Sequence, residues 1–95
     1  MSEAVETLRL DVWLWRARFF KTRTLATDYV NGRGVRISRA GQVRKVTKPS
    51  ATIIPGDVLT FSRGGTIHII EVLAIGTRRG PASEAATLYQ TVEGS

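Results

Sequence analysis

The stretch from Arg9 to Arg23 reads R-L-D-V-W-L-W-R-A-R-F-F-K-T-R, and it decides the fold of the first half of this chain. Within it, Leu10, Leu14 and Ala17 recur at the spacing of one helix face. We therefore predict a helix that runs to about Phe20 and packs this face against the core. The same fifteen residues include five cations and four large aromatic side chains, which suit a partner rich in phosphates and unpaired bases. Nucleic acid, and RNA in particular, is the first hypothesis.

The ends of two helices can be placed from residues that satisfy unpaired backbone groups. Asp11 is a suitable N-cap for the first helix, because its carboxylate can accept hydrogen bonds from backbone N–H groups. A second helix is predicted after Thr22 and is expected to end at Asn31-Gly32, where left-handed backbone is easily adopted. Its apolar face consists of Leu25, Ala26, Tyr29 and Val30. The two helices together resemble a helix-turn-helix hairpin.

From Gly34 onward the apolar residues alternate with a period of two, which predicts strands. Strands are expected at residues 35–38, 43–46, 58–61 and 66–75, with turns at 39–42 and 64–65. A last helix is predicted from the apolar spacing of Ala85, Leu88, Tyr89 and Val92, with Ser83 as its candidate cap. The fold class is therefore α+β, in one small domain, because 95 residues that are 42% hydrophobic can bury a single thin core.

The positive charge is concentrated in the first half of the chain. Residues 9–48 include eleven Lys or Arg against two Asp, a net charge of 11 − 2 = +9, whereas the remainder carries 3 − 6 = −3. Such a one-sided distribution favours a polyanionic partner over an anionic membrane surface. The sequence has no cysteine, no apolar run that could span a bilayer and no signal-peptide pattern at its start. We expect a cytoplasmic protein that binds no membrane.

Residues suited to catalysis or metal binding are sparse. His68 is the single histidine, and its place between Ile67 and Ile69 predicts a side chain on the outer face of a strand. The acidic residues are scattered, and each has a local explanation as a cap, a turn or a solvated side chain. Gly32-Arg33-Gly34 lacks the third glycine of a dinucleotide-binding motif. We expect no enzymatic activity, no metal and no cofactor.

The four aromatic side chains of the opening stretch divide into two pairs. On a helical wheel, Trp13 lies near the Leu10 face, and Phe20 is assigned with it to the core. Trp15 and Phe19 point away from that face. They are either buried between the second helix and the strands, or exposed as candidates for base stacking.

Several motifs together resemble a known RNA-binding domain. R-L-D at Arg9–Asp11, T-R at Thr22-Arg23, V-R-I at Val35–Ile37, K-P-S at Lys48–Ser50 and P-G-D at Pro55–Asp57 are similar to the domain first described in ribosomal small-subunit protein S-four, the alpha-L motif. More narrowly, W-L-W-R-A-R-F-F-K-T-R at Trp13–Arg23 and R-R-G-P-A-S-E-A-A-T-L-Y at Arg78–Tyr89 resemble the heat shock protein fifteen family. The resemblance extends from about Arg9 to Glu93.

This resemblance implies a two-helix hairpin packed on a small, strongly curved antiparallel sheet, with RNA bound by the hairpin and the adjacent sheet turn. It also implies binding to ribosomal RNA of the large ribosomal subunit, and heat-shock-related recycling of subunits that carry a nascent chain. The domain is expected at residues 9–76, between a flexible N-terminus (1–8) and a C-terminal extension (77–95) whose short helix packs on it. The expected RNA-binding residues are Arg9, Arg16, Arg18, Lys21, Thr22, Arg23, Arg36, Arg39 and Lys48.

Two other classes of function remain open. The helical hairpin could bind DNA as a helix-turn-helix, although neither helix has a face rich in Asn, Gln and Arg, and the second helix carries Thr27 and Asp28 instead. Alternatively, Trp15 and Phe19 could form a protein-interaction surface, whose binding would be insensitive to salt. Other structured RNA or DNA are therefore alternative partners, and we expect a monomer.

Overall fold

A five-stranded antiparallel sheet and two helices make up most of the computed structural model, which describes residues 6–92. The sheet has the order β3-β2-β5-β6-β7, and β1 pairs with β4 in a second, two-stranded sheet. The strands are β1 (Leu8–Arg9), β2 (Val35–Arg39), β3 (Gln42–Val46), β4 (Thr52–Ile53), β5 (Val58–Arg63), β6 (Thr66–Val72) and β7 (Tyr89–Thr91). The helices are α1 (Leu10–Arg16), α2 (Arg23–Gly32), α3 (Ala82–Ala85) and the 3-10 turn η1 (Ala86–Leu88). The predicted α+β class with a short C-terminal helix is confirmed.

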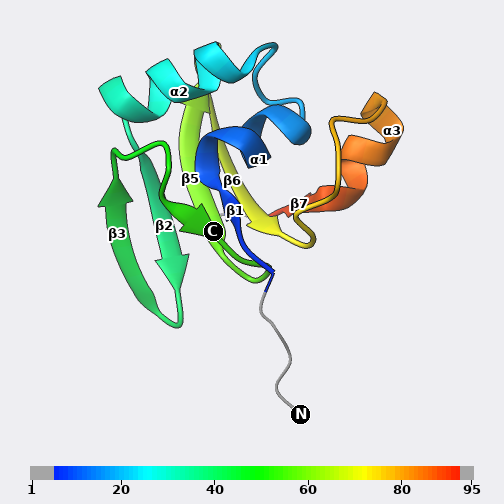
Figure 1. The fold of residues 1–95 in the computed structure, drawn as a ribbon. Helices are drawn as coiled ribbons and strands as arrows, with labels where there is room; N and C mark the ends of the chain where they lie inside the picture. Colours follow the sequence, from blue (N-terminus) through cyan, green and yellow to red (C-terminus); the bar gives the residue numbers. More distant parts are fainter. Residues whose placement is uncertain (1–5, 93–95) are drawn as a thin grey trace.

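The hydrophobic core lies between the helices and one face of the sheet. In Figure 1, α1 lies in front of β5 and β6, and α2 crosses the end of the sheet above it. Leu10, Trp13 and Leu14 of α1 are fully buried, as predicted, and Phe20 is buried with them. From the sheet, alternate residues reach the same core: Val35, Ile37, Leu59, Phe61, Ile70 and Val72. The period-two pattern therefore describes β2 and β5 correctly, whereas the strand predicted at residues 66–75 ends at Val72.

The first helix is shorter than predicted, because it ends at Arg16 rather than near Phe20. Arg18 has a positive φ of 65°, and the N–H groups of Arg18 and Phe19 donate to the carbonyl oxygens of Trp15 (3.1 Å) and Leu14 (3.0 Å). This pair of bonds is the Schellman arrangement that stops a helix. Arginine takes the left-handed position here that glycine usually takes, so composition did not signal the stop.

Asp11 is not the N-cap of α1, because Arg9 precedes the helix and Asp11 lies in its first turn. β1 immediately before the helix explains the shift: Leu8 pairs with Ile53, and Arg9 pairs with Thr52. The extended strand therefore fixes where the helix begins. β1 starts at the last residue of the segment expected to be flexible, and residues 1–5 of that segment lie outside the described residues.

The second helix begins as predicted, with Thr22 as the N-cap whose hydroxyl oxygen accepts from the N–H of Leu25 at 3.0 Å. Of its predicted apolar face, Ala26 and Val30 are fully buried, whereas Leu25 is 45% exposed, so the core-facing side of the helix is narrower than predicted. The end of the helix also differs from the prediction. Gly32 is the last helical residue, and the left-handed conformation falls at Gly34 (φ 79°) rather than at Asn31-Gly32. A Cβ on Gly34 would lie 2.9 Å from Cε of Lys45 and 3.1 Å from the carbonyl oxygen of Val46. The close approach of β3 therefore requires glycine there.

His68 faces the core, which corrects the prediction that it lies on the outer face of its strand. It pairs with the buried Phe61 across β5 and β6, and its ring stacks on Phe61 at 5.4 Å between centroids. Ile67 and Ile69 take the outer face instead, and Ile67 is 70% exposed. The prediction failed because isoleucine occurs at both odd and even positions of this strand, so the sequence does not show which side chains face the core.

The last helical pattern is only partly a helix. α3 ends at Ala85, η1 follows, and Tyr89–Thr91 then form β7 on the edge of β6. Ser83 lies inside α3, whose N-cap is Pro81. The predicted helix through Val92 is thus wrong, because the N–H of Val92 donates to the carbonyl oxygen of Ile69 at 2.8 Å. The edge of β6 has unpaired backbone N–H and C=O groups, and pairing with them stabilises this segment as a strand. A helix this short is not stable by itself in water.

Candidate nucleic-acid interface

Three of the fourteen Lys and Arg side chains form ion pairs with carboxylates of the protein. Arg9 binds Asp11 and Arg39 binds Asp57, each through two hydrogen bonds of 2.7 to 3.0 Å, and both aspartates are 1% exposed. Arg78 binds Glu84 at 2.7 and 3.1 Å on the surface of the C-terminal extension. These pairs neutralise much of the charge that the three arginines would offer to a ligand.

Four more arginines donate hydrogen bonds to backbone carbonyl oxygens. Arg16 donates to Gly76 (2.8 Å), Arg18 to Gly80 (2.7 Å) and Arg79 to Trp15 (3.0 Å). These three bonds join α1 and the loop after it to the segment that leads into α3. Arg63 donates to the carbonyl oxygen of Phe19 and lies over the Phe20 ring, 5.1 Å from its centroid. All four therefore stabilise tertiary structure.

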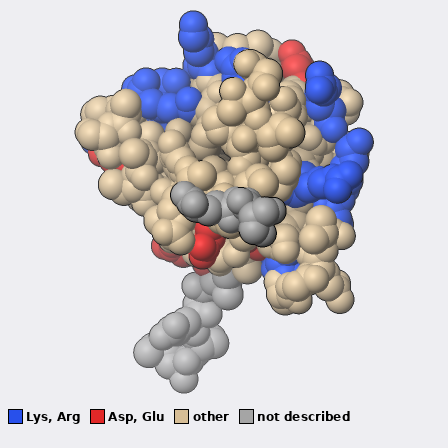
Figure 2. Space-filling view, turned by 180° about the vertical axis from the view of Figure 1, so that it is seen from behind, with Lys and Arg blue, Asp and Glu red and all other residues tan. Residues whose placement is uncertain are grey.

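The remaining seven cations form no ion pair or side-chain hydrogen bond to any residue in the described range 6–92. We call them the unpaired cations: Lys21, Arg23, Arg33, Arg36, Arg44, Lys45 and Lys48. All belong to α2, the residues that flank it, the β2–β3 hairpin, or the loop after β3. Figure 2 shows the opposite side of the molecule from Figure 1, with Lys and Arg most extensive on the side of β2 and β3 and few charges at the centre. Charge that can interact with a ligand is therefore concentrated in one part of the fold.

Asp11 joins three elements beneath the first turns of α1 and α2. Its carboxylate accepts from Arg9 of β1, from the Thr27 hydroxyl of α2 at 2.8 Å, and from the N–H of Val12 at 2.8 Å. Burial raises the pKa of Asp11, but the hydrogen bonds from Arg9 and Thr27 and the positive charge of Arg9 together outweigh burial and lower it below its ordinary value. The carboxylate is therefore charged at neutral pH and positions the N-terminal end of α2.

An open hollow is lined by Asp11 itself together with Arg9, Arg23, Thr24 and Thr27, and the Asp11 carboxylate within it is paired with Arg9. Lys48 belongs to the loop that supports α1, since the N–H of Asp11 donates to the carbonyl oxygen of Pro49 at 3.3 Å. The N–H groups of the first helical turn carry a partial positive charge, which adds to that of Arg23. This end of α2 is suited to a phosphate group.

The structure separates the RNA-binding residues predicted from sequence into two groups. Lys21, Arg23, Arg36 and Lys48 are unpaired cations, whereas Thr22 caps α2. The side chains of the second group already form ion pairs or hydrogen bonds within the protein, and we call them the engaged cations: Arg9, Arg16, Arg18 and Arg39. Direct RNA contact by any of the nine remains a prediction.

Sequence reasoning missed three of the unpaired cations, namely Arg33, Arg44 and Lys45. Arg44 and Lys45 lie on β3, an edge strand whose residues 42–45 are all exposed. The signal that could have found them is the pair of adjacent cations in a strand pattern with no buried alternation.

The two candidates for base stacking are placed differently. The Phe19 ring packs against Phe61, His68 and Tyr89, with centroids 4.7 to 5.3 Å apart, so the fold already uses its faces. Trp15 is half-buried, and the guanidinium of Arg79 lies 5.7 Å from its ring centroid. Base stacking therefore remains a prediction for Trp15, while Phe19 belongs to an aromatic cluster.

The S4 domain family model matches residues 8–59, which include α1, α2 and the β2–β3 hairpin. Heat shock protein 15 of Escherichia coli K12 is 45% identical over 92% of this chain, and the homolog of Aeromonas salmonicida is 35% identical over 99%. The chain belongs to the S4 domain family, in its heat shock protein 15 branch. It spans 61% of the length of the Escherichia coli protein. This membership confirms the family predicted from the motifs, and it supports RNA binding as the class of function.

A solved structure supports the same branch of the S4 domain family. Heat shock protein 15 of Vibrio cholerae is similar with a TM-score of 0.77 and 39% identity, over 92% of this chain and 83% of that chain. That protein is described as trimeric, so the expectation of a monomer for the present chain gains no support from it.

Residues 6–92 lack two further features, a membrane-spanning helix and a metal-binding cluster. No helix among them is long and apolar enough to cross a membrane. No group of three or more His, Asp or Glu side chains in that range could bind a metal ion.

Proposed function

We propose that this protein binds ribosomal RNA of the large ribosomal subunit and acts there in the recycling, after heat stress, of subunits that carry a nascent chain. The observation that carries the proposal is the concentration of all seven unpaired cations on α2, its flanks, the β2–β3 hairpin and the following loop. Membership of the S4 domain family supports RNA as the polyanion. A ribosomal partner places the protein in the cytoplasm.

Binding should depend mainly on phosphate contacts. Lys21 and Arg23 stand at the N-terminal end of α2, where the helix dipole favours an anion, while Arg36 and Lys45 extend from the sheet. The spread of these charges over two elements suits a folded RNA whose backbone approaches from two directions. Recognition is then by shape and charge, with base contacts in a secondary role.

Insertion of α2 into a DNA groove is less well supported. Its solvent-exposed side presents Leu25, which is 45% exposed, and the acidic Asp28. A recognition helix needs hydrogen-bond donors that reach base edges, and an aspartate faces repulsion from the phosphates. Competition of duplex DNA against ribosomal RNA separates the two functions, because a helix-turn-helix protein should prefer the duplex.

The decisive experiment is sedimentation of the purified protein with separated large subunits, small subunits and whole ribosomes over a salt series. We expect the protein to pellet with large subunits at low salt and to be released as salt rises, because phosphate contacts release counterions. Pelleting that does not respond to salt would favour a protein-interaction module instead. Failure to pellet with any of the three particles at low salt would defeat the ribosomal proposal.

A further inference from the structure

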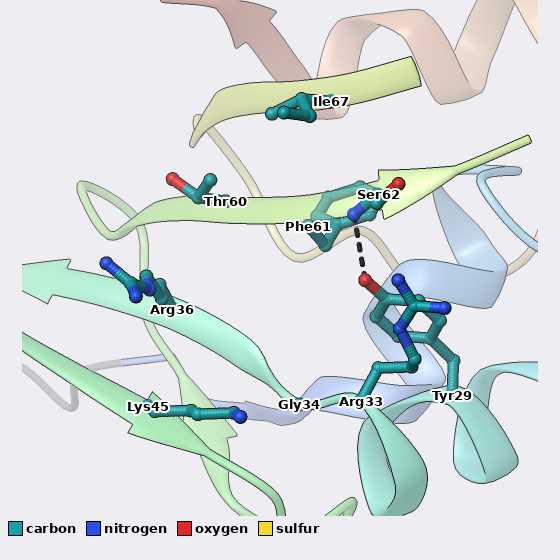
Figure 3. Close-up of a pocket in the computed structure, with 9 residues that line it drawn as sticks. All are labelled: Tyr29, Arg33, Gly34, Arg36, Lys45, Thr60, Phe61, Ser62 and Ile67. Carbon is teal, nitrogen blue, oxygen red and sulfur yellow. Dashed lines mark hydrogen bonds between the residues drawn. The ribbon is translucent and has the colours of Figure 1, made fainter. Parts of the chain in front are cut away.

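The sheet is split where β2 and β5 diverge. The two strands pair only from Val58 opposite Ser38 to Thr60 opposite Arg36, after which β5 continues to Arg63 paired with β6 alone. The Tyr29 hydroxyl reaches into this split and accepts the N–H of Ser62 at 2.8 Å. Its own proton has no acceptor among the described residues. A hollow of about 250 Å³ opens at the split. Figure 3 shows the residues that line it.

The charges that line the hollow all have one sign. Arg33 follows α2, Arg36 comes from β2 and Lys45 from β3, and no carboxylate lines the hollow with them. Arg36 and Lys45 are direct cross-strand neighbours. Like charges placed opposite each other destabilise a sheet, so this pair is best explained by an anion that lies between or above them.

The far side of the hollow is apolar. Ile67 of β6 lines it across from the cations, as Figure 3 shows, and is the most exposed of the large hydrophobic side chains that the structure describes, at 70%. Thr60 and Ser62 lie between the apolar and the charged sides. An occupant that carries a phosphate at one end and a flat apolar group at the other would match both sides. A nucleotide has this chemistry.

We propose that this hollow takes one unpaired nucleotide of the bound RNA, with its phosphate at Arg36 and Lys45 and its base against Ile67. The volume is below the roughly 300 to 1,000 Å³ of sites that enclose a drug-sized ligand, so the hollow has room for at most one nucleotide, which would stay partly exposed to solvent. A paired base is stacked inside its helix, whereas an unpaired base can be turned outward and bound by side chains. This inference rests on the proposed RNA binding and adds a subsite to it.

The test compares two RNA hairpins with the same stem, one fully paired and one with a single bulged nucleotide. We expect the wild-type protein to bind the bulged hairpin about fivefold to tenfold more tightly, as one charge-assisted contact and one apolar contact allow. Lys45→Ala and Ile67→Ser should each lower this ratio, because each removes one of the two contacts, and the double variant should bring it close to one. Excess uridine monophosphate should also remove the preference, whereas inorganic phosphate at the same concentration should leave it in place.

Matched controls come from the same strand. Arg44→Ala removes one charge from β3, and Val43→Ser removes one exposed apolar side chain, both outside the hollow. Both controls should keep the wild-type ratio, although Arg44→Ala, which removes one unpaired cation, should weaken binding to both hairpins equally. Thermal unfolding should show that all of the variants remain folded. Equal wild-type affinity for the two hairpins, or an unchanged ratio in Lys45→Ala and Ile67→Ser, would overturn the subsite alone. If inorganic phosphate competes as effectively as uridine monophosphate, the hollow is an anion site without preference for a base. Absence of binding to either hairpin and to large subunits would overturn the proposed function as well.

Discussion

Arg18 occupies a left-handed position at the end of α1, and its guanidinium donates to Gly80 at 2.7 Å. Any residue with a Cβ is strained at this φ, whereas glycine is not. The hydrogen bond to Gly80 compensates for part of that strain and anchors the C-terminal extension. One residue therefore both stops a helix and joins two segments distant in sequence.

Two substitutions separate the cost of the left-handed backbone from the contribution of the hydrogen bond to Gly80. Arg18→Ala and Arg18→Gly both lose that bond, but only the glycine variant removes the strain at the positive φ. We expect Arg18→Gly to be more stable than Arg18→Ala by about 1 kcal/mol in the free energy of unfolding, measured by urea titration. An alanine variant at least as stable as the glycine variant would show that the left-handed conformation costs nothing here.

At the scale of elements, Asp11 couples β1, α1 and α2, and its pKa is lowered in the folded protein. A carboxyl group with a lowered pKa stabilises the fold fully above its unfolded-state pKa of about 3.9 and loses this contribution as pH falls through the folded value. The free energy of unfolding should therefore decrease as the pH is lowered from about 5 to 3. Asp11→Asn should be less stable at neutral pH and should show a shallower decrease. Parallel pH curves for the two proteins, from urea titrations, would contradict this role.

At the scale of the whole molecule, we expect the unpaired cations to contribute to RNA affinity more than the arginines whose side chains already bind other groups of the protein. Arg23→Ala should reduce the slope of log affinity against log salt concentration by about one, because one phosphate contact is lost. Arg78→Ala removes the same charge, but its partner is Glu84 in the C-terminal extension, so the slope should stay at the wild-type value. Fluorescence anisotropy with a ribosomal RNA fragment over a salt series measures both. Equal slopes in the two variants would mean that net charge, rather than position, governs binding.

The sequence by itself determined the α+β class, the family and the core residues of α1, and it favoured a polyanionic partner. Four patterns along the chain carry this information: helix spacing at Leu10, Leu14 and Ala17, alternation at Val35 and Ile37, the start of a helix after Thr22, and the excess of cations in residues 9–48. Each is a pattern in the order of residues along the chain, so it can be recognised without knowing which distant residues come into contact.

Only the tertiary structure decided which cations are available to a ligand. Arg16 and Arg18 follow the same sequence pattern as Lys21 and Arg23, yet their hydrogen-bond acceptors are carbonyl oxygens about sixty residues further along the chain. Likewise, Tyr89 follows a helical spacing in the sequence, but it forms a strand because it pairs with Val72 at the edge of β6. A side chain or backbone group bonds to whatever folding brings within about 3 Å of it, and the spacing of residues along the chain does not specify those distant neighbours.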